Sequence, residues 1–192
     1  SLIGLCATWA LDPSEPVALT AAMKHAFVKD REGLATLERY FLRGPRRWRD
    51  LVGLRDSIDT RHLIEPYASF KRPEQDEAIV LVDRLIDLFD ETDADLSGHA
   101  DVDGSRAAER IAALAGRIGE APLPWAGEDG RKAADLFVSI REISDQLGPM
   151  PPRALVELIH AQSAQITVSA GLVEHPRLAI WGPLEARLQS AG

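Results

Sequence analysis

Cysteine is almost absent from the chain, since Cys6 is the single one among 192 residues. One cysteine excludes an internal disulfide framework and any cluster of thiolate ligands around a metal. Chains of this kind are typical of reducing compartments, so the sequence predicts a cytoplasmic protein. No apolar run approaches the ~20 residues that a transmembrane helix needs, and the opening SLIGLCATWAL lacks the basic start of a signal peptide. We therefore expect no membrane partner.

The motifs that carry common chemistries are also missing. There is no Gly-x-Ser-x-Gly elbow, no Walker phosphate loop and no Gly-x-Gly-x-x-Gly turn. The 5 histidines include no pair at the i,i+4 spacing that a helical zinc site uses. Carboxylate pairs such as Asp101 and Asp103 fall in a loop expected to be solvated, where nothing raises a pKa. We predict no catalytic residue, no metal and no cofactor in this chain.

Basic residues are outnumbered, with 22 lysines and arginines against 30 aspartates and glutamates. The formal net charge is −8 at pH 7 and the isoelectric point is about 5.1. Domains that bind nucleic acid strongly usually carry a basic surface. The balance therefore argues against strong nucleic-acid binding by the chain as a whole, but it leaves room for a local basic patch.

Most of the sequence has the apolar periodicity of amphipathic helices, which predicts a mainly α, bundle-like fold. Ser14 and Asp30 occupy positions expected for N-caps, and Gly44-Pro45 is expected to end a helix. The stripes predict helices over residues 19–27, 34–41, 58–65, 74–90, 107–118, 136–147 and 153–163, with a linker over residues 119–130.

Strand-like residues appear only near the end, at residues 165–169 and 178–181. A lone strand needs a partner for its backbone donors and acceptors. We therefore expect a helical subdomain over residues 1–163 and a short strand and turn tail over residues 164–192. The tail would belong to a sheet whose other strands lie outside this sequence.

The stretch DADLSGHADVDG resembles a calcium-binding loop. Asp93, Asp95, Ser97 and Asp101 match ligand positions, with a glycine at the sharp turn. The twelfth position of such a loop needs a glutamate that binds calcium through both carboxylate oxygens, and here it is Gly104. The pattern therefore favours a solvated acidic loop between two helices over a calcium site.

The stretch RGPRRWR gathers four arginines around one tryptophan. Arginine forks suit phosphate oxygens, and an indole can stack on a base. The alternative is that the first arginine neutralises the carbonyls of its helix C-terminus and the others pair with carboxylates. The candidate DNA contacts are Arg43, Arg46, Arg47, Trp48 and Arg49.

The ending HPRLAIWGPLEARLQSA resembles the alphaproteobacterial form of the AddB family, one subunit of the AddAB helicase–nucleases that process DNA double-strand breaks. PVALTAAMKHAF and LERYFLRGPR resemble two further runs of that family, in the same order. Within the ending, the residues that match the family motif are Gly182, Pro183, Leu184, Glu185, Ala186 and Arg187.

The resemblance implies a helical segment like the insertion in the second motor domain of superfamily-one helicases. The chain starts at Ser1 rather than methionine and ends before the family's Asn-Glu-Gly loop, so we expect a central piece of a longer protein. The whole protein would then use ATP with magnesium and an iron–sulphur cluster elsewhere, and would act on DNA together with an AddA-like partner subunit. This piece would be a non-catalytic scaffold and a guide for the DNA backbone.

A second interpretation stays open from the residues alone. The chain would be an independent, acidic, helical protein-interaction module with a weak calcium loop at Asp93–Asp103.

Overall fold

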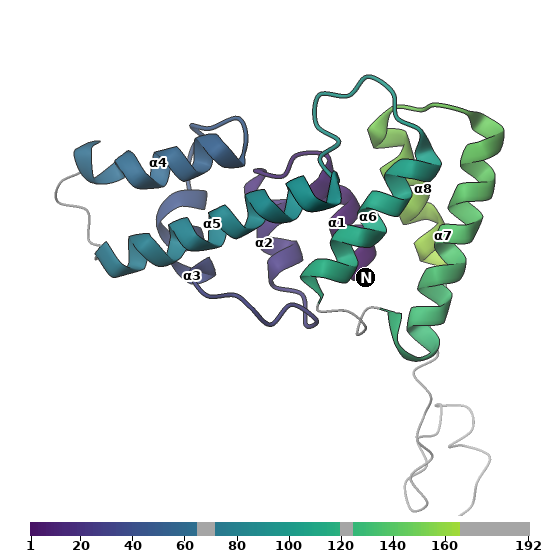
Figure 1. Cartoon of the computed structure of the whole chain (residues 1–192), viewed down its shortest axis with the longest axis horizontal. Helices are drawn as coiled ribbons and strands as arrows, with labels where there is room; N and C mark the ends of the chain where they lie inside the picture. Colours follow the sequence, from purple (N-terminus) through teal and green to yellow (C-terminus); the bar gives the residue numbers. More distant parts are fainter. Residues whose placement is uncertain (65–71, 120–124, 166–192) are drawn as a thin grey trace, which may run out of the picture.

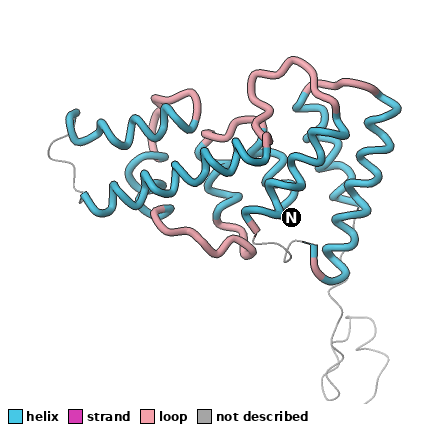
Figure 2. The backbone as a smooth tube through the Cα atoms, viewed as in Figure 1, coloured by secondary structure: helices cyan, strands magenta, loops and turns pink. Residues whose placement is uncertain are grey.

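The computed structural model describes residues 1–64, 72–119 and 125–165. Within these ranges the chain forms helices that pack side by side, and the only β pairing is one isolated bridge between Val102 and Met150 (Figures 1 and 2). The predicted mainly α fold is therefore confirmed for this part of the chain. The elements are α1 (Leu2–Ala10), α2 (Pro16–Met23), α3 (Leu34–Leu37), the π-helical turn η1 (Glu38–Leu42), α4 (Leu51–Ile64), α5 (Arg72–Thr92), α6 (Gly104–Ile118), α7 (Gly127–Leu147) and α8 (Pro152–Gln165).

Helix α1 lies at the centre and was not predicted. Its residues are apolar apart from the exposed Thr8, and most of them are buried, so the helix shows no clear amphipathic stripe. It contacts α2, α6 and α8, and Trp9 packs edge-on against Phe89 of α5 at 4.9 Å between ring centroids. Burial raises the pKa of the Cys6 thiol to about 12, so this thiol stays protonated and is not a nucleophile.

Helices α4 and α5 pair along their length at one end of the molecule (Figure 1). The stripe predicted for residues 74–90 is confirmed: Leu81, Val82, Leu85 and Phe89 are buried on α5. Helix α4 is longer than predicted, because it begins at Leu51 rather than at residue 58. The Asp50 carboxylate accepts a hydrogen bond from Gly53 N at 2.7 Å and so caps its first turn.

Between α1 and α4, the residues at the N-termini of the helices are not the ones that were predicted as N-caps. The Glu15 side chain, not that of Ser14, caps α2, by accepting from Ala18 N at 2.6 Å. Gly33, not Asp30, precedes α3, with a positive φ of 80° that L side chains rarely adopt. Helix α2 ends at Met23, so the side chain of Phe27 lies outside it and is exposed.

Helices α6, α7 and α8 form the other end and contact one another in sequence (Figure 1). Asp103 caps α6, and α7 ends at Leu147, the residue where the predicted helix over residues 136–147 ends. The expected linker is shorter at its C-terminal end, because α7 begins at Gly127. Gln165 belongs to α8 rather than to a strand, and the rest of the predicted tail lies outside the described residues.

Candidate nucleic-acid interface

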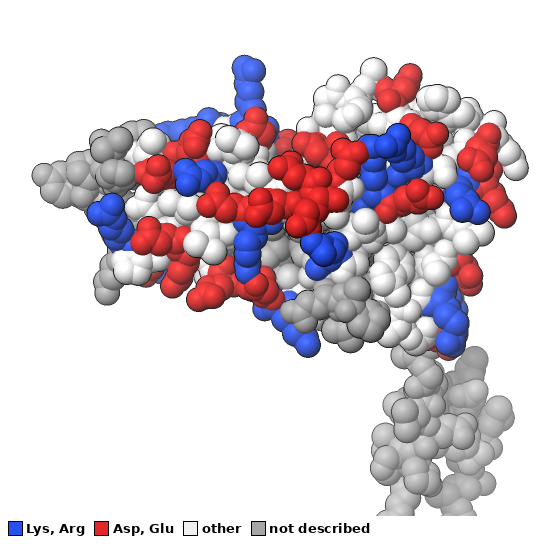
Figure 3. Space-filling model, viewed as in Figure 1, with Lys and Arg blue, Asp and Glu red and all other residues white. Residues whose placement is uncertain are grey.

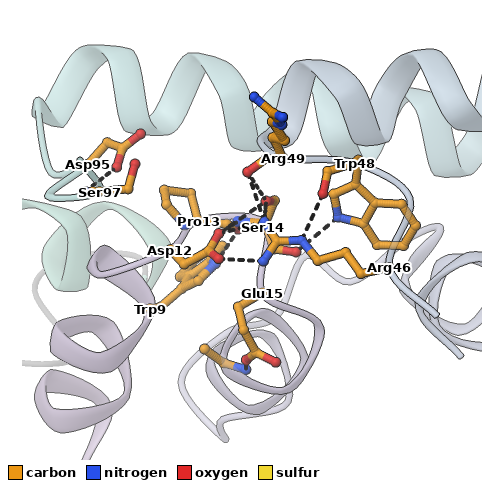
Figure 4. Close-up of polar contacts among 11 residues, drawn as sticks. Trp9, Asp12, Pro13, Ser14, Glu15, Arg46, Trp48, Arg49, Asp95 and Ser97 are labelled. Atoms are coloured by element: carbon orange, nitrogen blue, oxygen red, sulfur yellow. Dashed lines mark hydrogen bonds and ion pairs between the residues drawn. The ribbon is translucent and has the colours of Figure 1, made fainter. Parts of the chain in front are cut away.

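Residues 43–50, which we call the arginine loop, connect η1 to α4. As predicted, the helical segment ends just before Gly44, whose φ of 105° suits only glycine. The loop folds back onto the turn between α1 and α2, and a polar network joins the two (Figure 4). Two segments more than thirty positions apart in sequence are therefore held together at this point.

The Arg46 guanidinium is the centre of this network. Its Nε donates to Trp48 O at 3.0 Å, and its Nη2 donates to Asp12 Oδ1 at 2.9 Å and to Arg49 O at 2.8 Å. Further hydrogen bonds go to Asp12 Oδ2 and Ser14 Oγ. All three guanidinium nitrogens are thus engaged within the protein. Arg46, one of the predicted DNA contacts, instead pairs with a carboxylate and holds two loops together.

The acidic partner of this pair has a shifted pKa. Burial alone would raise the pKa of Asp12, but hydrogen bonds from Arg46 and Ser14 outweigh it, and the pKa lies below its ordinary value of 3.8. The bond to Asp12 likewise raises the pKa of Arg46. The two groups are therefore both charged at neutral pH, and the network depends on that charge.

Trp48 is fixed by the same network. Its Nε1 donates to Ser14 O at 3.1 Å. Ser14 itself is 0% exposed, and its Oγ donates within the network, to Asp12 Oδ1 at 3.1 Å or Arg49 O at 3.2 Å. Figure 4 shows the indole nitrogen turned toward the network and the six-membered ring turned away from it, while the Arg49 side chain extends outward. The indole therefore presents a positioned aromatic surface on the other side.

That surface lines a pocket of about 300 Å³ between the arginine loop, η1 and α4. We call it the arginine pocket. Its described lining contains three arginines and no carboxylate, in a chain whose net charge is −8. The lining residues are Phe41, Arg43, Pro45, Arg47, Trp48, Ser57, Thr60 and Arg61.

The three arginines are held to different degrees. The guanidinium carbon of Arg61 lies 5.1 Å from the centroid of the Phe41 ring, and its Nη1 donates to Tyr40 O. Arg43 is 72% exposed and lies 3.9 Å from a Glu38 oxygen. Arg47 makes no hydrogen bond or ion pair with any residue in the described ranges. One cation is thus fixed on the wall, and two extend toward solvent.

Glu38 is the carboxylate nearest to Arg43, and it is paired mainly with another residue. Lys24 Nζ lies 2.6 Å from Glu38 Oε2. The hydrogen bond from Lys24 is the main cause that lowers the pKa of Glu38, and Arg43 contributes least. Glu38 therefore neutralises Lys24 more than it neutralises the pocket.

The structure thus divides the five predicted DNA contacts. Arg43, Arg47 and Trp48 line one pocket, the Arg49 side chain extends away from the network without lining the pocket, and Arg46 is engaged internally. Sequence reasoning missed three pocket residues on α4: Ser57, Thr60 and Arg61. Their spacing places them on one helix face. Only Ser57 precedes the predicted helix over residues 58–65, and no local pattern shows that this face of α4 meets the arginine loop.

The acidic loop, residues 93–103, does not gather its carboxylates. Asp93 pairs with Arg110, Asp95 Oδ1 accepts from Ser97 N at 2.8 Å, and Asp103 caps α6. Across the described ranges no group of three or more His, Cys, Asp or Glu side chains is placed to hold a metal ion. The calcium candidates Asp93, Asp95, Ser97 and Asp101 therefore do not form a coordination sphere.

A larger pocket of about 700 Å³ lies at the start of α1, against α7 and α8. Its polar groups include His25, Lys132 and His160, and its described lining contains no carboxylate. His160 bonds to Thr8 Oγ1 at 2.9 Å, which ties α8 to α1. The described lining therefore offers no carboxylate to pair with either imidazole.

In the described parts of the chain, every helix is too short or too polar to cross a lipid bilayer. The family-motif residues Gly182 to Arg187 lie outside the described ranges. Comparison with known proteins found no matching family model, no similar curated protein and no similar solved structure.

Proposed function

We propose that this chain is a non-catalytic helical module of an AddB-like subunit, in a helicase–nuclease that processes DNA double-strand ends. Within it the helices would act as a scaffold, and exposed arginines would contact the DNA backbone. The partner would be an AddA-like subunit, with ATP, magnesium and an iron–sulphur cluster bound elsewhere in the complex. We further propose a cytoplasmic location, which the single buried cysteine supports.

One observation carries the DNA contact. Three arginines surround a positioned indole, with no carboxylate on the described wall, although the chain as a whole is acidic. Arginine forks bind phosphate oxygens in pairs, and such contacts set position rather than sequence. With Arg46 engaged internally, the residues proposed to contact phosphate are Arg43, Arg47 and Arg49.

The assignment to this class of machine is supported by the sequence. The run LERYFLRGPR, which resembles the family, contains Arg43 and Arg46. The terminal motif Gly182 to Arg187 supports the further proposal that the helices correspond to the insertion in the second motor domain of superfamily-one helicases. Both supports are likenesses of residues, and fold analogy alone does not give a function.

A binding titration tests the DNA contact. Fluorescence anisotropy with a labelled DNA oligonucleotide is measured from low to physiological salt, for the native chain and for the triple variant R43E/R47E/R49E. The matched control is R106E/R131E/R141E, which makes the same charge change at exposed arginines of α6 and α7. We expect weak binding that falls steeply with salt, is abolished in the first variant and retains more affinity in the control.

Two results would overturn the proposal. One is binding that does not depend on salt, and the other is an equal loss in both triple variants. The family assignment has its own test, the codons that follow Gly192. An apolar strand followed by Asn-Glu-Gly supports it, and a stop codon at that point contradicts it.

An acidic protein-interaction module is the second candidate, and one surface favours it. Figure 3 shows acidic side chains gathered in a band across the middle of this face, over α5. Basic proteins would be the expected partners of such a band. No DNA binding even at low salt, together with retention on a basic protein matrix, would favour this candidate. The exposed acidic residues of α5 are Asp76, Glu77, Asp87, Asp90 and Glu91.

A further inference from the structure

We infer that the arginine pocket binds a single unpaired nucleotide of a DNA strand, so that the chain prefers single-stranded DNA to duplex. This inference rests on the proposed DNA contact and adds the strand state and the way in which the base is held. It is carried by the juxtaposition of three kinds of group in one concave site: cations, an aromatic wall and hydroxyl oxygens.

The size of the site limits what can enter it. A volume of about 300 Å³ lies at the lower end of the range of small-ligand pockets, so it fits one nucleotide and not the width of a double helix. A duplex could touch the arginines at the rim only through its backbone. Its bases are stacked inside and cannot reach an indole on the pocket wall unless they are flipped out.

The aromatic wall is already in place without a ligand. The Nε1 hydrogen bond to Ser14 O and the network around Arg46 fix Trp48. A base that stacks on this ring therefore does not have to immobilise it, which favours binding. Base–aromatic stacking depends little on sequence because every base has a π face.

The phosphate and the base have separate partners. Arg43 and Arg47 extend toward solvent at the pocket, where they can follow a phosphate, and Arg61 adds a fixed positive charge on α4. The hydroxyls of Ser57 and Thr60 donate to Leu54 O and Asp56 O, both at 2.8 Å. Their oxygens therefore offer lone pairs to the pocket, which suit the amino group of a base rather than a phosphate.

The experiment compares one labelled 12-nucleotide strand with its own duplex, at low salt, by fluorescence anisotropy. We expect the native chain to bind the single strand about tenfold more tightly. Trp48→Leu should reduce single-strand affinity to about the duplex level, whereas Trp48→Phe, which keeps an aromatic ring, should retain most of the preference. Arg47→Ala should weaken binding severalfold. It should also reduce by about one the slope of the logarithm of the binding constant against the logarithm of the salt concentration. Arg106→Ala serves as the matched control.

The outcomes separate the two proposals. Equal affinity of the native chain for strand and duplex overturns the single-nucleotide inference and leaves the DNA contact standing. No binding of either at low salt overturns both. A free deoxynucleoside monophosphate that competes as well as the strand overturns the assignment to DNA. The comparison of strand and duplex needs no variant, and circular dichroism checks that each variant is folded.

Discussion

The arginine loop and the acidic loop are both short polar connections that lead into a helix, and they use their charges in different ways. In the arginine loop one arginine is engaged with Asp12 and the others face a pocket or solvent. In the acidic loop, side chains of Asp93, Asp95 and Asp103 make local contacts, while Ala94, Leu96 and Val102 are buried. The comparison teaches that a run of like charges becomes a candidate site only when several of its side chains converge on one pocket.

The largest effect on stability is expected at Leu96, the buried side chain that fixes the acidic loop to the core. Leu96 is 1% exposed, and its N–H donates to Ala10 O at 2.8 Å. Leu96→Ala should lower the free energy of unfolding by about 3 kcal/mol, because it leaves a cavity in the core. Urea denaturation measures this. Leu147→Ala, at a residue that is 67% exposed, is the control and should stay within about 0.5 kcal/mol of the native chain.

The next largest effect on stability is expected at Arg46, the centre of the network in the arginine loop. Arg46→Ala removes the donor for Asp12, Ser14 Oγ and the loop carbonyls. Since the side chain is 29% exposed, water replaces part of the lost bonding, and we expect about 2 kcal/mol of destabilisation. Arg47→Ala changes the same charge in the same loop without breaking a described contact. Equal destabilisation by the two substitutions would contradict the assigned role of Arg46.

A pH titration should separate the charge of this network from its packing. The pKa of Asp12 is lowered in the folded chain, so its contribution is present above the unfolded value of about 3.8 and is lost as pH falls through the folded value. Asp12→Asn should therefore be less stable than the native chain at pH 7, and this difference in stability should narrow below pH 3.8. A difference that stays constant with pH would show that the carboxylate charge does not matter.

The smallest effect is expected from calcium. Since Asp93 pairs with Arg110 and no group of three or more His, Cys, Asp or Glu side chains in the described ranges is placed to hold a metal ion, millimolar calcium should not raise the unfolding temperature measured by thermal denaturation. Specific binding would stabilise the folded chain by RT ln(1 + [L]/Kd). A rise that chelation reverses would restore the calcium loop as a site and weaken the contrast between the two loops.

Local signals in the sequence predicted the amphipathic part of the fold. The stripe on α5 and the stop at Gly44-Pro45 depend on residues a few positions apart, and both are confirmed. Helix α1 was not predicted because apolar residues at nearly every position remove the periodicity that reveals a helix. The start of α4 was not predicted because its cap, Asp50, directly follows the run RGPRRWR, which was considered for its arginines and not as the approach to a helix.

The sequence predicted which kinds of residue form the candidate site, but not how their side chains are arranged. The sequence indicates that arginines gather around Trp48, yet it cannot show that Asp12, thirty-four positions earlier, engages Arg46. For the same reason Ser14 was expected as a helix cap, while it is buried under the arginine loop. Contacts between distant segments decide which member of a charge cluster faces solvent, and no local pattern contains them.

The central position of α1 has a consequence for how the chain folds during synthesis. Its partners include α8, and the bond between Thr8 and His160 joins residues 152 positions apart. The part of α1 that α8 covers must therefore stay uncovered until α8 has been made. Such distant pairings slow folding, and exposed apolar surface favours aggregation in the meantime. Premature termination before α8 should thus produce chains that depend on chaperones.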